Sequence, residues 1–458
     1  MALSKEEIAL IEGLKKSLAA TAAQDELLLR YYRGQQRVEQ LGMAIPPAMR
    51  HFLVLANWCR VHVDTTNNRQ NVRALIVPGE ETADPRLRAI ADASNLDAHI
   101  KMFNQDRMIY GRSFLSVGTN EEDPSLPLIR VESPREMVAD VDIRRERIRA
   151  AARFYGVHKN GQGQRYVTLY KPDETVWAER SGSTWVEVDR DPHKLGAVPV
   201  VMHLNRRMSG GWVGESQMSD VIPFADAAAR ALTNLQFAQE AHGIPRMYMT
   251  GVASGDFVDK QGNPIPKFEA YFNAIHTIAN EKAQVGQLTA ADLKNFETAV
   301  NIYGKQASVA TGFPARYFGI HTTNPPAEGA YRADEAQLVE SVEAQNLEVG
   351  ITLGWVGALA LRFATGQWVT GNRVRVEWHD PATPTVSQRE DALAKRRAAG
   401  VLSMEGYWDE LGWSEARKAK EREYLARERA ADIDPYLGAV QAKDAAVSDA
   451  DADASAVG

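Results

Sequence analysis

Cysteine is nearly absent from this sequence of 458 residues, which contains only Cys59. A single thiol cannot form an intramolecular disulfide, and such low usage is typical of proteins assembled in a reducing compartment. Long apolar runs are also missing, since the longest extends from Gly350 to Leu361, short of the roughly 20 residues that cross a bilayer. The stretch from Met1 to Leu18 interleaves charged and apolar residues, unlike a signal peptide. We therefore expect a soluble protein without a membrane partner.

An excess of positive charge is missing as well. The chain has 53 Lys and Arg against 60 Asp and Glu, which gives a formal net charge of −7. A protein that coats DNA neutralises phosphates with clustered Lys and Arg, so this balance argues against that class. The same charge balance is compatible with a protein past which DNA slides.

The common catalytic signatures do not occur. Gly161–Gly163 lacks the third glycine of a dinucleotide-binding loop, and Gly214–Ser216 lacks the closing glycine of a nucleophile elbow. No phosphate-binding-loop lysine and no HExxH pair is present. Cys59 and His62 could face one metal from a helix, but two ligands are half a site, and ordinary packing residues are the favoured interpretation. We predict no enzyme activity, no cofactor and no metal site.

Helical patterns dominate the N-terminal part of the chain. Apolar spacing predicts a helix over Ser4–Arg33, with Gly34 as its stop. A second helix is expected after Pro46-Pro47 and through Trp58. A third is expected from Pro85 to Ile109, where Asp84 before Pro85 is a cap and first-turn signal.

Short β-rich runs separated by turn clusters occupy the region from Ser113 to His203. This pattern predicts antiparallel hairpins. The expected strands are Phe114–Val117, Tyr166–Tyr170, Thr175–Trp177 and Trp185–Val188. The glycine-rich stretch Ser209–Gly214 then marks a flexible join.

An alanine-rich helix with little charge is predicted over Glu215–Ala241. Its small side chains suit close packing in a ring of identical neighbours, and a buried helix of a monomer explains them equally well. A strand-and-turn module should follow over Ile244–Gln284, and then a helix over Thr289–Val309 with Thr289 as its cap. Gly319–Gly329 is an irregular loop, for which a plain surface connector is the simplest interpretation.

The C-terminal part combines long helices with one strand. A helix is predicted over Ala330–Phe363, a strand over Arg373–Trp378 and a charged helical pair over Val386–Arg429, around Gly400. The segment after Pro435 has few large apolar residues, so we expect disorder there. The fold class is α+β and mainly helical.

Five segments, taken in order, resemble the portal proteins of siphophages, in particular of the actinophage type. Asn324–Ala330, followed by Arg332 and Glu335, is similar to the family's loop before a long helix. The other four segments are Tyr31–Gly34, Tyr110–Gly118, Gly214–Ser216 and Trp378–Pro381. The likeness extends over roughly residues 24–430, and the shared order carries it. Gly329 and the double proline depart from the commoner Ser-x-Glu-Ala pattern, and the tail after Pro435 has no counterpart.

The resemblance implies a portal fold and a ring-forming subunit, usually one of twelve, at one vertex of a virion capsid assembled in the host cytoplasm. Double-stranded DNA would pass through the ring during packaging and ejection. The implied parts are a wing (1–214), a stem helix (215–242), a clip (243–288), a second stem helix (289–312), a tunnel-loop region (313–330), a long wing helix with a strand (331–385), a crown (386–435) and a disordered tail (436–458).

Implied partners are the major capsid protein and scaffold, the terminase large subunit whose ATPase drives packaging, and later a head–tail adaptor. The channel lining should be neutral or acidic with sparse cations, because a basic lining would hold phosphates. The stem channel candidates are Asp220, Asp226, Arg230, Glu240, Asp292, Lys294 and Lys305. The tunnel-loop candidates nearest DNA are His321, Thr322, Thr323 and Asn324.

The sequence leaves two other functions open. A different head–tail adaptor or tail protein would also lack an active site, but it predicts no small module between two stem-like helices. An unfamiliar nucleic-acid enzyme predicts clustered acidic or histidine side chains in one loop region, which the sequence does not show.

Overall fold

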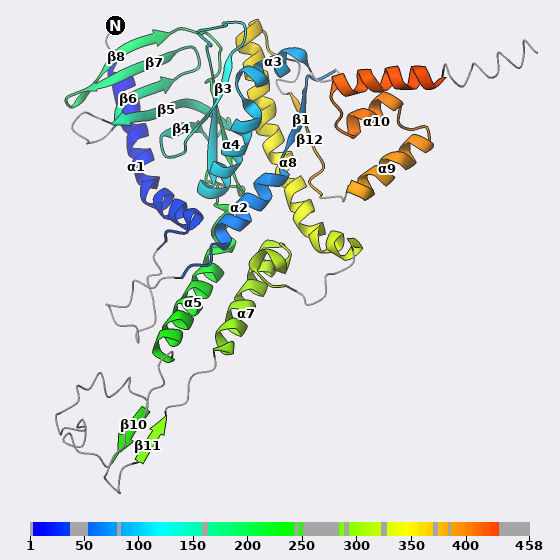
Figure 1. Cartoon of the computed structure of the whole chain (residues 1–458). Coiled ribbons are helices and arrows are strands. Elements are labelled where there is room, and N and C mark those ends of the chain that lie inside the picture. Colours follow the sequence, from blue (N-terminus) through cyan, green and yellow to red (C-terminus); the bar gives the residue numbers. More distant parts are fainter. Residues whose placement is uncertain are drawn as a thin grey trace, which may run out of the picture. The chain divides into compact units, whose positions relative to one another are not determined.

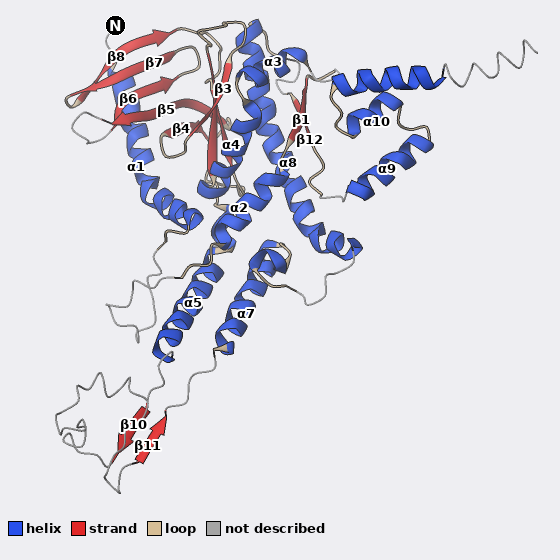
Figure 2. Ribbon diagram, viewed as in Figure 1, coloured by secondary structure: helices blue, strands red, loops and turns tan. Residues whose placement is uncertain are grey.

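The computed structural model describes residues 3–36, 54–79, 84–157, 164–242, 247–250, 284–287, 293–321, 328–369, 374–382 and 386–429 (Figure 1). The chain forms two compact units, Met1–Ala382 and Thr383–Gly458. The first contains both helices and sheets, and the described part of the second is helical (Figure 2).

The first helix, α1 (Lys5–Arg33), has the predicted bounds because its sequence carries signals at both ends. The Ser4 hydroxyl accepts from the backbone N–H of Glu7, and the Glu7 carboxylate accepts from the backbone N–H of Ser4. This reciprocal cap satisfies two N–H groups that a helix start leaves free. Gly34 ends the helix in the left-handed conformation, at φ 66°.

The next helices differ in part from the expectation. They are α2 (Trp58–Arg69), α3 (Pro85–Ala93) and α4 (Leu96–Tyr110), and strand β1 (Val72–Ile76) follows α2. Asp84 caps α3 as predicted, since its carboxylate accepts from the N–H groups of Arg86 and Leu87. The single helix expected over 85–109 is wrong, because Asn95 adopts φ 48° and divides it in two. The helix expected before Trp58 is absent over 54–57, and residues 46–53 lie outside the described part.

The predicted hairpins form two antiparallel sheets. A three-stranded sheet has the order β3-β2-β9, from β2 (Arg112–Gly118), β3 (Leu128–Glu132) and β9 (Val200–Leu204). A five-stranded meander runs in sequence order through β4 (Met137–Asp142), β5 (Arg147–Val157), β6 (Gln164–Tyr170), β7 (Thr175–Ser181) and β8 (Thr184–Asp191). Helix α1 covers one face of the five-stranded sheet, where Ile11 and Leu14 pack against Phe154 and Val167.

The three-stranded sheet is covered on both faces. Leu115 points into a cluster with Val349 and Leu353 of the long helix α8 (Glu328–Thr365). Phe114, the preceding residue, packs with Met137 and Ala151 of the five-stranded sheet. A two-stranded sheet of β1 and β12 (Arg375–Trp378) lies beside α8. By length and composition, Ala330–Thr365 could cross a membrane, but 56% of its most apolar window is buried, as in the core helix of a globular protein.

Below this body, two helices extend side by side toward a small β-hairpin (Figure 1). They are α5 (Ile222–His242), preceded by the 3₁₀ turn η2 (Gln217–Asp220), and α7 (Lys294–Thr311), followed by η4 (Ala315–Phe318). The hairpin strands are β10 (Met247–Thr250) and β11 (Gln284–Gln287). The alanine-rich helix predicted over 215–241 starts later than expected, at Ile222, and its Ala225 and Ala229 are fully buried. Helix α7 starts at Lys294, and the cap candidate Thr289 lies outside the described residues.

The second unit contains α9 (Val386–Ala398), α10 (Met404–Glu410) and a further helix over 415–429. Gly400 lies between α9 and α10 and has a φ of 74°, as its place in the sequence indicates. Leu393 and Trp408 are buried, and Trp408 stacks on Trp413 with ring centroids 5.8 Å apart. The expected helical pair is therefore a set of three helices. The tail after Pro435 lies outside the described residues.

Candidate functional site

Two glycine motifs that are distant in the sequence meet where the body joins α5. Gly111 ends α4 at φ 76°, and a Cβ on Gly214 would lie 1.8 Å from the Gly111 carbonyl oxygen. The backbones are held there by Asn205, whose N–H donates to Gly111 O over 2.8 Å and whose carbonyl accepts from Glu215 N–H over 2.8 Å. Only glycine at both positions permits this contact, so the path of the chain into α5 is fixed by backbone packing.

A buried arginine reinforces the same joint. Arg107 is 1% exposed, and its guanidinium donates to side-chain oxygens of Asn205 at 2.7 Å, Gln345 at 3.2 Å and Gln70 at 2.5 Å. Burial lowers the Arg107 pKa to about 9, which keeps the group charged at neutral pH. Because its partners come from α8, from the end of β9 and from the segment after α2, this cation holds those elements together around the start of α5.

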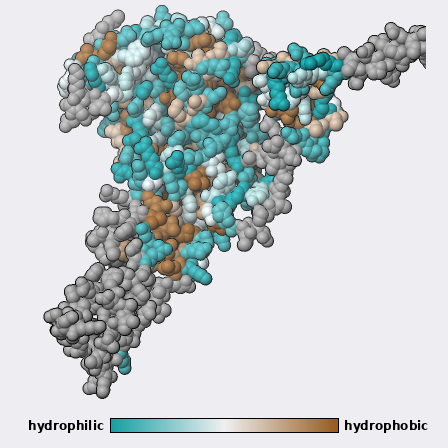
Figure 3. Space-filling model, viewed as in Figure 1, coloured by the Kyte–Doolittle hydropathy of each residue, from teal (hydrophilic) through white to brown (hydrophobic). Residues whose placement is uncertain are grey.

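Helices α5 and α7 pack closely through small side chains. Ala228 of α5 and Ala307 of α7 are fully buried in one cluster. Away from this contact, α7 exposes two large apolar residues, Ile302 at 51% and Val309 at 77%. Figure 3 shows apolar side chains gathered over the region of α5 and α7. A surface of this kind usually marks an interaction site.

The predicted stem residues fall into three groups. Asp220 and Asp226 have partners within the chain: Asp220 pairs with Arg206 over 2.8 Å, and Asp226 accepts from the Tyr31 hydroxyl over 2.8 Å. Lys294 and Lys305 are exposed on α7, and Arg230 is half-buried on α5. Glu240 belongs to α5, but its side chain lies outside the described residues, as does the whole of Asp292. The structure thus brings Lys294 and Lys305 to one helix and places the two described acids in intrachain contacts.

Ion pairs fasten η4, which precedes the loop before α8, to α8 itself. Arg316 of η4 forms ion pairs with Asp334 and Glu335 of α8. Glu335 also accepts from Arg69 and from the Tyr317 hydroxyl, each over 3.2 Å. His321, at the start of the loop, is exposed. The other loop candidates, Thr322, Thr323 and Asn324, lie outside the described residues.

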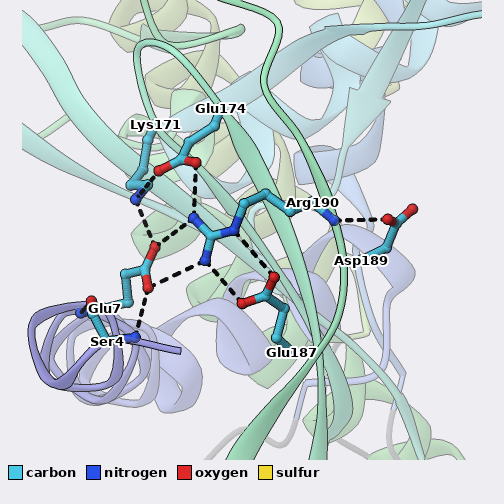
Figure 4. A network of polar contacts seen from close by, with 7 residues as sticks. All are labelled: Ser4, Glu7, Lys171, Glu174, Glu187, Asp189 and Arg190. Atoms are coloured by element: carbon cyan, nitrogen blue, oxygen red, sulfur yellow. Dashed lines mark hydrogen bonds and ion pairs between the residues drawn. The ribbon is translucent and has the colours of Figure 1, made fainter. Parts of the chain in front are cut away.

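An ionic network fastens α1 to the five-stranded sheet (Figure 4). Arg190 of β8 donates to Glu7 over 3.0 Å and to Glu174 over 2.8 Å, and Lys171 donates to Glu7 over 2.6 Å. Burial by itself would raise the Glu7 pKa, but hydrogen bonds from Arg190, Lys171 and Ser4 outweigh it and hold the pKa well below its ordinary value. Hydrogen bonds to the carboxylates of Glu187, Glu7 and Glu174 raise the Arg190 pKa, and Glu187 contributes most.

The pair considered as half a metal site is part of the core. Cys59 and His62 are each 1% exposed, and the His62 ring lies 4.5 Å from the Phe313 ring between centroids. Burial raises the Cys59 pKa to about 12 and lowers the His62 pKa to about 3, so both side chains are neutral at physiological pH. Within the described ranges, no group of three or more His, Cys, Asp or Glu side chains is arranged to hold a metal ion.

Comparison with known proteins decides the family. A sequence model of the family described as phage portal protein, SPP1 Gp6-like, matches residues 15–434. The portal protein of Mycobacterium phage D29 is 32% identical over 411 residues, which cover 87% of this chain and 84% of that protein. The portal protein of Mycobacterium phage L5 is 31% identical over 434 residues, covering 92% and 87%.

The chain belongs to the phage portal protein family. A solved structure titled as the neck of an empty gene transfer agent particle, with C6 symmetry, aligns with a TM-score of 0.46 at 13% identity, covering 84% of this chain and 93% of that one.

The resemblance seen in the sequence is confirmed, and the segments that carry it lie at contacts between elements of this portal protein. Tyr110–Gly118 and Gly214–Ser216 meet at the glycine contact. Tyr31 binds Asp226 and so ties the end of α1 to α5. The carbonyl of Pro381 accepts from Arg69, at the base of the loop, over 2.9 Å.

Sequence reasoning did not find Arg107, Arg316 or Arg69. Their partners are distant in the sequence, and an arginine inside a helical pattern looks like any surface arginine. The weak signal for Arg107 is its place next to Met108 and Ile109, which are both buried.

Proposed function

We propose that this portal protein is the subunit of a closed ring through which double-stranded DNA enters and leaves a phage capsid. The observation that carries the proposal is the pair α5 and α7. Helix α5 starts beside the glycine contact and runs away from the body, and α7 runs back toward it (Figure 1). In a single chain, α7 exposes Ile302 and Val309. Neighbouring copies in a ring would cover such residues.

The proposed parts follow the sequence assignment. The wing is 1–214 together with 331–385, the stem consists of 215–242 and 289–312, and the clip is the segment between them, 243–288. The tunnel-loop region is 313–330, the crown is 386–435, and the tail is 436–458. Support comes from the order of elements: two packed helices flank the small hairpin of β10 and β11, and the long helix α8 returns to the wing core.

The proposed channel carries few positive charges. Lys294 and Lys305 are the exposed cations of α7, and Glu297 stands exposed between them. Phosphate binding gains affinity with each cation it engages, through release of counterions. A lining with two spaced lysines per subunit would therefore bind the DNA phosphates only weakly, which suits a duplex that has to move.

The remaining roles are proposed from family membership. The wing would contact the major capsid protein and scaffold, and the clip would bind the terminase large subunit and later a head–tail adaptor. The subunit would be a structural protein of the virion, without enzyme activity or cofactor, assembled in the host cytoplasm. Terminase would supply the energy for DNA movement, and the ring would usually have twelve copies.

Negative-stain electron microscopy and mass measurement of the purified protein test the proposal. Rings with an open central channel are expected. Ile302→Asp with Val309→Asp should prevent ring formation, because the stem contacts would bury two carboxylates. Val401→Asp is the control, since Val401, at 79%, is about as exposed as Val309 but lies in the second unit. Closed particles without a channel, or robust nuclease or ATPase turnover, would contradict the proposal.

A further inference from the structure

One side of the first unit combines exposed apolar residues with arginines. At the turn between β4 and β5, Ile143 is 73% exposed, and in the loop before α5, Met208 is 75% and Val213 is 78% exposed. The turn also presents three exposed arginines, Arg144, Arg145 and Arg147. We call these six residues the hairpin face. None of the three arginines forms an ion pair with any residue that the structure describes.

The hairpin face is held in a defined shape. The Asp142 carboxylate accepts from the backbone N–H groups of Arg144 and Arg145, at 3.0 and 3.1 Å, which fixes the turn. Arg207 joins the loop to the turn through an ion pair with Glu146 at 3.0 Å, and its guanidinium lies 4.0 Å from the centre of the Trp212 ring. The two segments therefore form one surface.

A second surface, of opposite charge, lies on α8. Glu340, Glu343, Leu347 and Ile351 recur at helical spacing and share one side of the helix, the side opposite the buried Leu338, Val342 and Val349. Leu347 is 72% and Ile351 is 46% exposed. We call these four residues the helix stripe. Within the described part of the chain, neither of its glutamates has an ion-pair partner.

The two surfaces lie on opposite sides of the first unit. The turn of the hairpin face belongs to the five-stranded sheet, which packs on the Phe114 face of the three-stranded sheet. The helix stripe belongs to α8, which packs on the Leu115 face. Figure 1 shows β4 and α8 on either side of these strands.

We propose that the hairpin face of one copy of this chain binds the helix stripe of the next copy. The inference rests on the proposed ring and names its contact between subunits. Each surface offers apolar side chains together with unpaired charges, and the charges have opposite sign, so the two are complementary. Because they point away from each other, one chain cannot join them, and contact between different patches on successive copies forms a ring when the rotation closes. Complementary charges at an interface select the partner and fix the register of the contact. Added salt weakens the attraction between these charges.

Charge reversal tests the contact in the full-length chain. The two variants are Arg144→Glu with Arg145→Glu, and Glu340→Arg with Glu343→Arg; each places like charges across the proposed contact. In analytical ultracentrifugation and negative stain, either variant alone should lose the ring species. A mixture of the two variants should recover it, because every hairpin face then meets a stripe of opposite charge. Glu121→Arg with Glu122→Arg is the matched control, since these exposed glutamates lie in the β2–β3 loop, and it should form rings like the unchanged protein.

The possible outcomes separate this inference from the proposed function. Rings that persist in both reversal variants would overturn the contact while leaving the ring in place. Loss of rings in both variants without recovery on mixing would also overturn it, provided that circular dichroism shows the variants folded. An unchanged protein that stays monomeric in the presence of capsid protein and scaffold would overturn the proposed function, and the contact with it.

Discussion

Mild acid should weaken the body of the protein through two buried histidines. His62 packs against Phe313, and Nδ1 of His203 bonds to the Thr352 hydroxyl over 2.8 Å. Burial lowers the pKa of each imidazole to about 3. The folded protein therefore keeps both rings neutral at pH 5, whereas the unfolded chain protonates them near their ordinary pKa of about 6.5. The stability that depends on neutral histidines is therefore fully present above a pH of about 6.5. It is lost as the pH falls from about 6.5 toward the folded pKa of about 3.

The size of the effect follows from the linkage relation. Between pH 7 and pH 5, each histidine should lower the free energy of unfolding by about 2 kcal/mol. Asp106 acts in the opposite direction, because burial raises its pKa to about 7 and the folded protein gains a proton there that the unfolded chain does not bind at pH 5. Its contribution is also about 2 kcal/mol, so the net loss in the unchanged protein is about that of one histidine.

Variants separate these contributions. Urea unfolding, followed by tryptophan fluorescence at pH 7 and pH 5, gives the change in unfolding free energy for each protein. His62→Phe and His203→Gln should each reduce the loss on acidification by about 2 kcal/mol, whatever their stability at pH 7. Asp106→Asn should increase the loss by a similar amount. If the histidine variants and the unchanged protein lose the same free energy to within about 0.5 kcal/mol, the reasoning from burial is wrong.

Three further changes test single contacts by thermal or urea unfolding. Gly214→Ala should destabilise by about 3 kcal/mol because the new Cβ collides with backbone, whereas Gly13→Ala, with nothing within 4 Å of its Cβ, should be neutral or mildly stabilising. Arg112→Met should cost about 3 to 5 kcal/mol by leaving its buried carboxylate partner on α1 unpaired; Arg88→Met, from an exposed pair, should cost under about 1 kcal/mol. Glu7→Gln should remove the stability that the unchanged protein loses as pH falls below about 4.3, because the Glu7 pKa is lowered on folding. If the Glu7→Gln variant and the unchanged protein lose the same unfolding free energy below that pH, the prediction for Glu7 is wrong.

Local signals predicted local structure well. The Ser4 cap and the Gly34 stop define α1, and Asp84 before Pro85 starts α3, because each signal acts within one helical turn. The break at Asn95 was not predicted, since asparagine adopts the left-handed conformation only where the surroundings favour it.

The candidate site was predicted less well, because it depends on contacts between distant segments. The order of motifs indicated the family, but the collision that requires glycine at Gly111 and Gly214 exists only when the two backbones meet. Asp220 and Asp226 looked like free acids in the sequence, and both have partners from other elements. The exposure of Ile302 likewise depends on which face of α7 packs against α5.

Helix α8 can act as a lever. Its 38 residues form one continuous rod, about 57 Å long at 1.5 Å per residue. The N-terminal part is clamped to Arg316 and packs through Leu338 and Val342 in one cluster, while Val349 and the residues beyond it pack in another. A force on the chain just before Glu328 would act on a rod that the ion pairs of Arg316 hold near one end. Because the rod is continuous, part of that force would reach the cluster around Val349 and Leu353 at the other end.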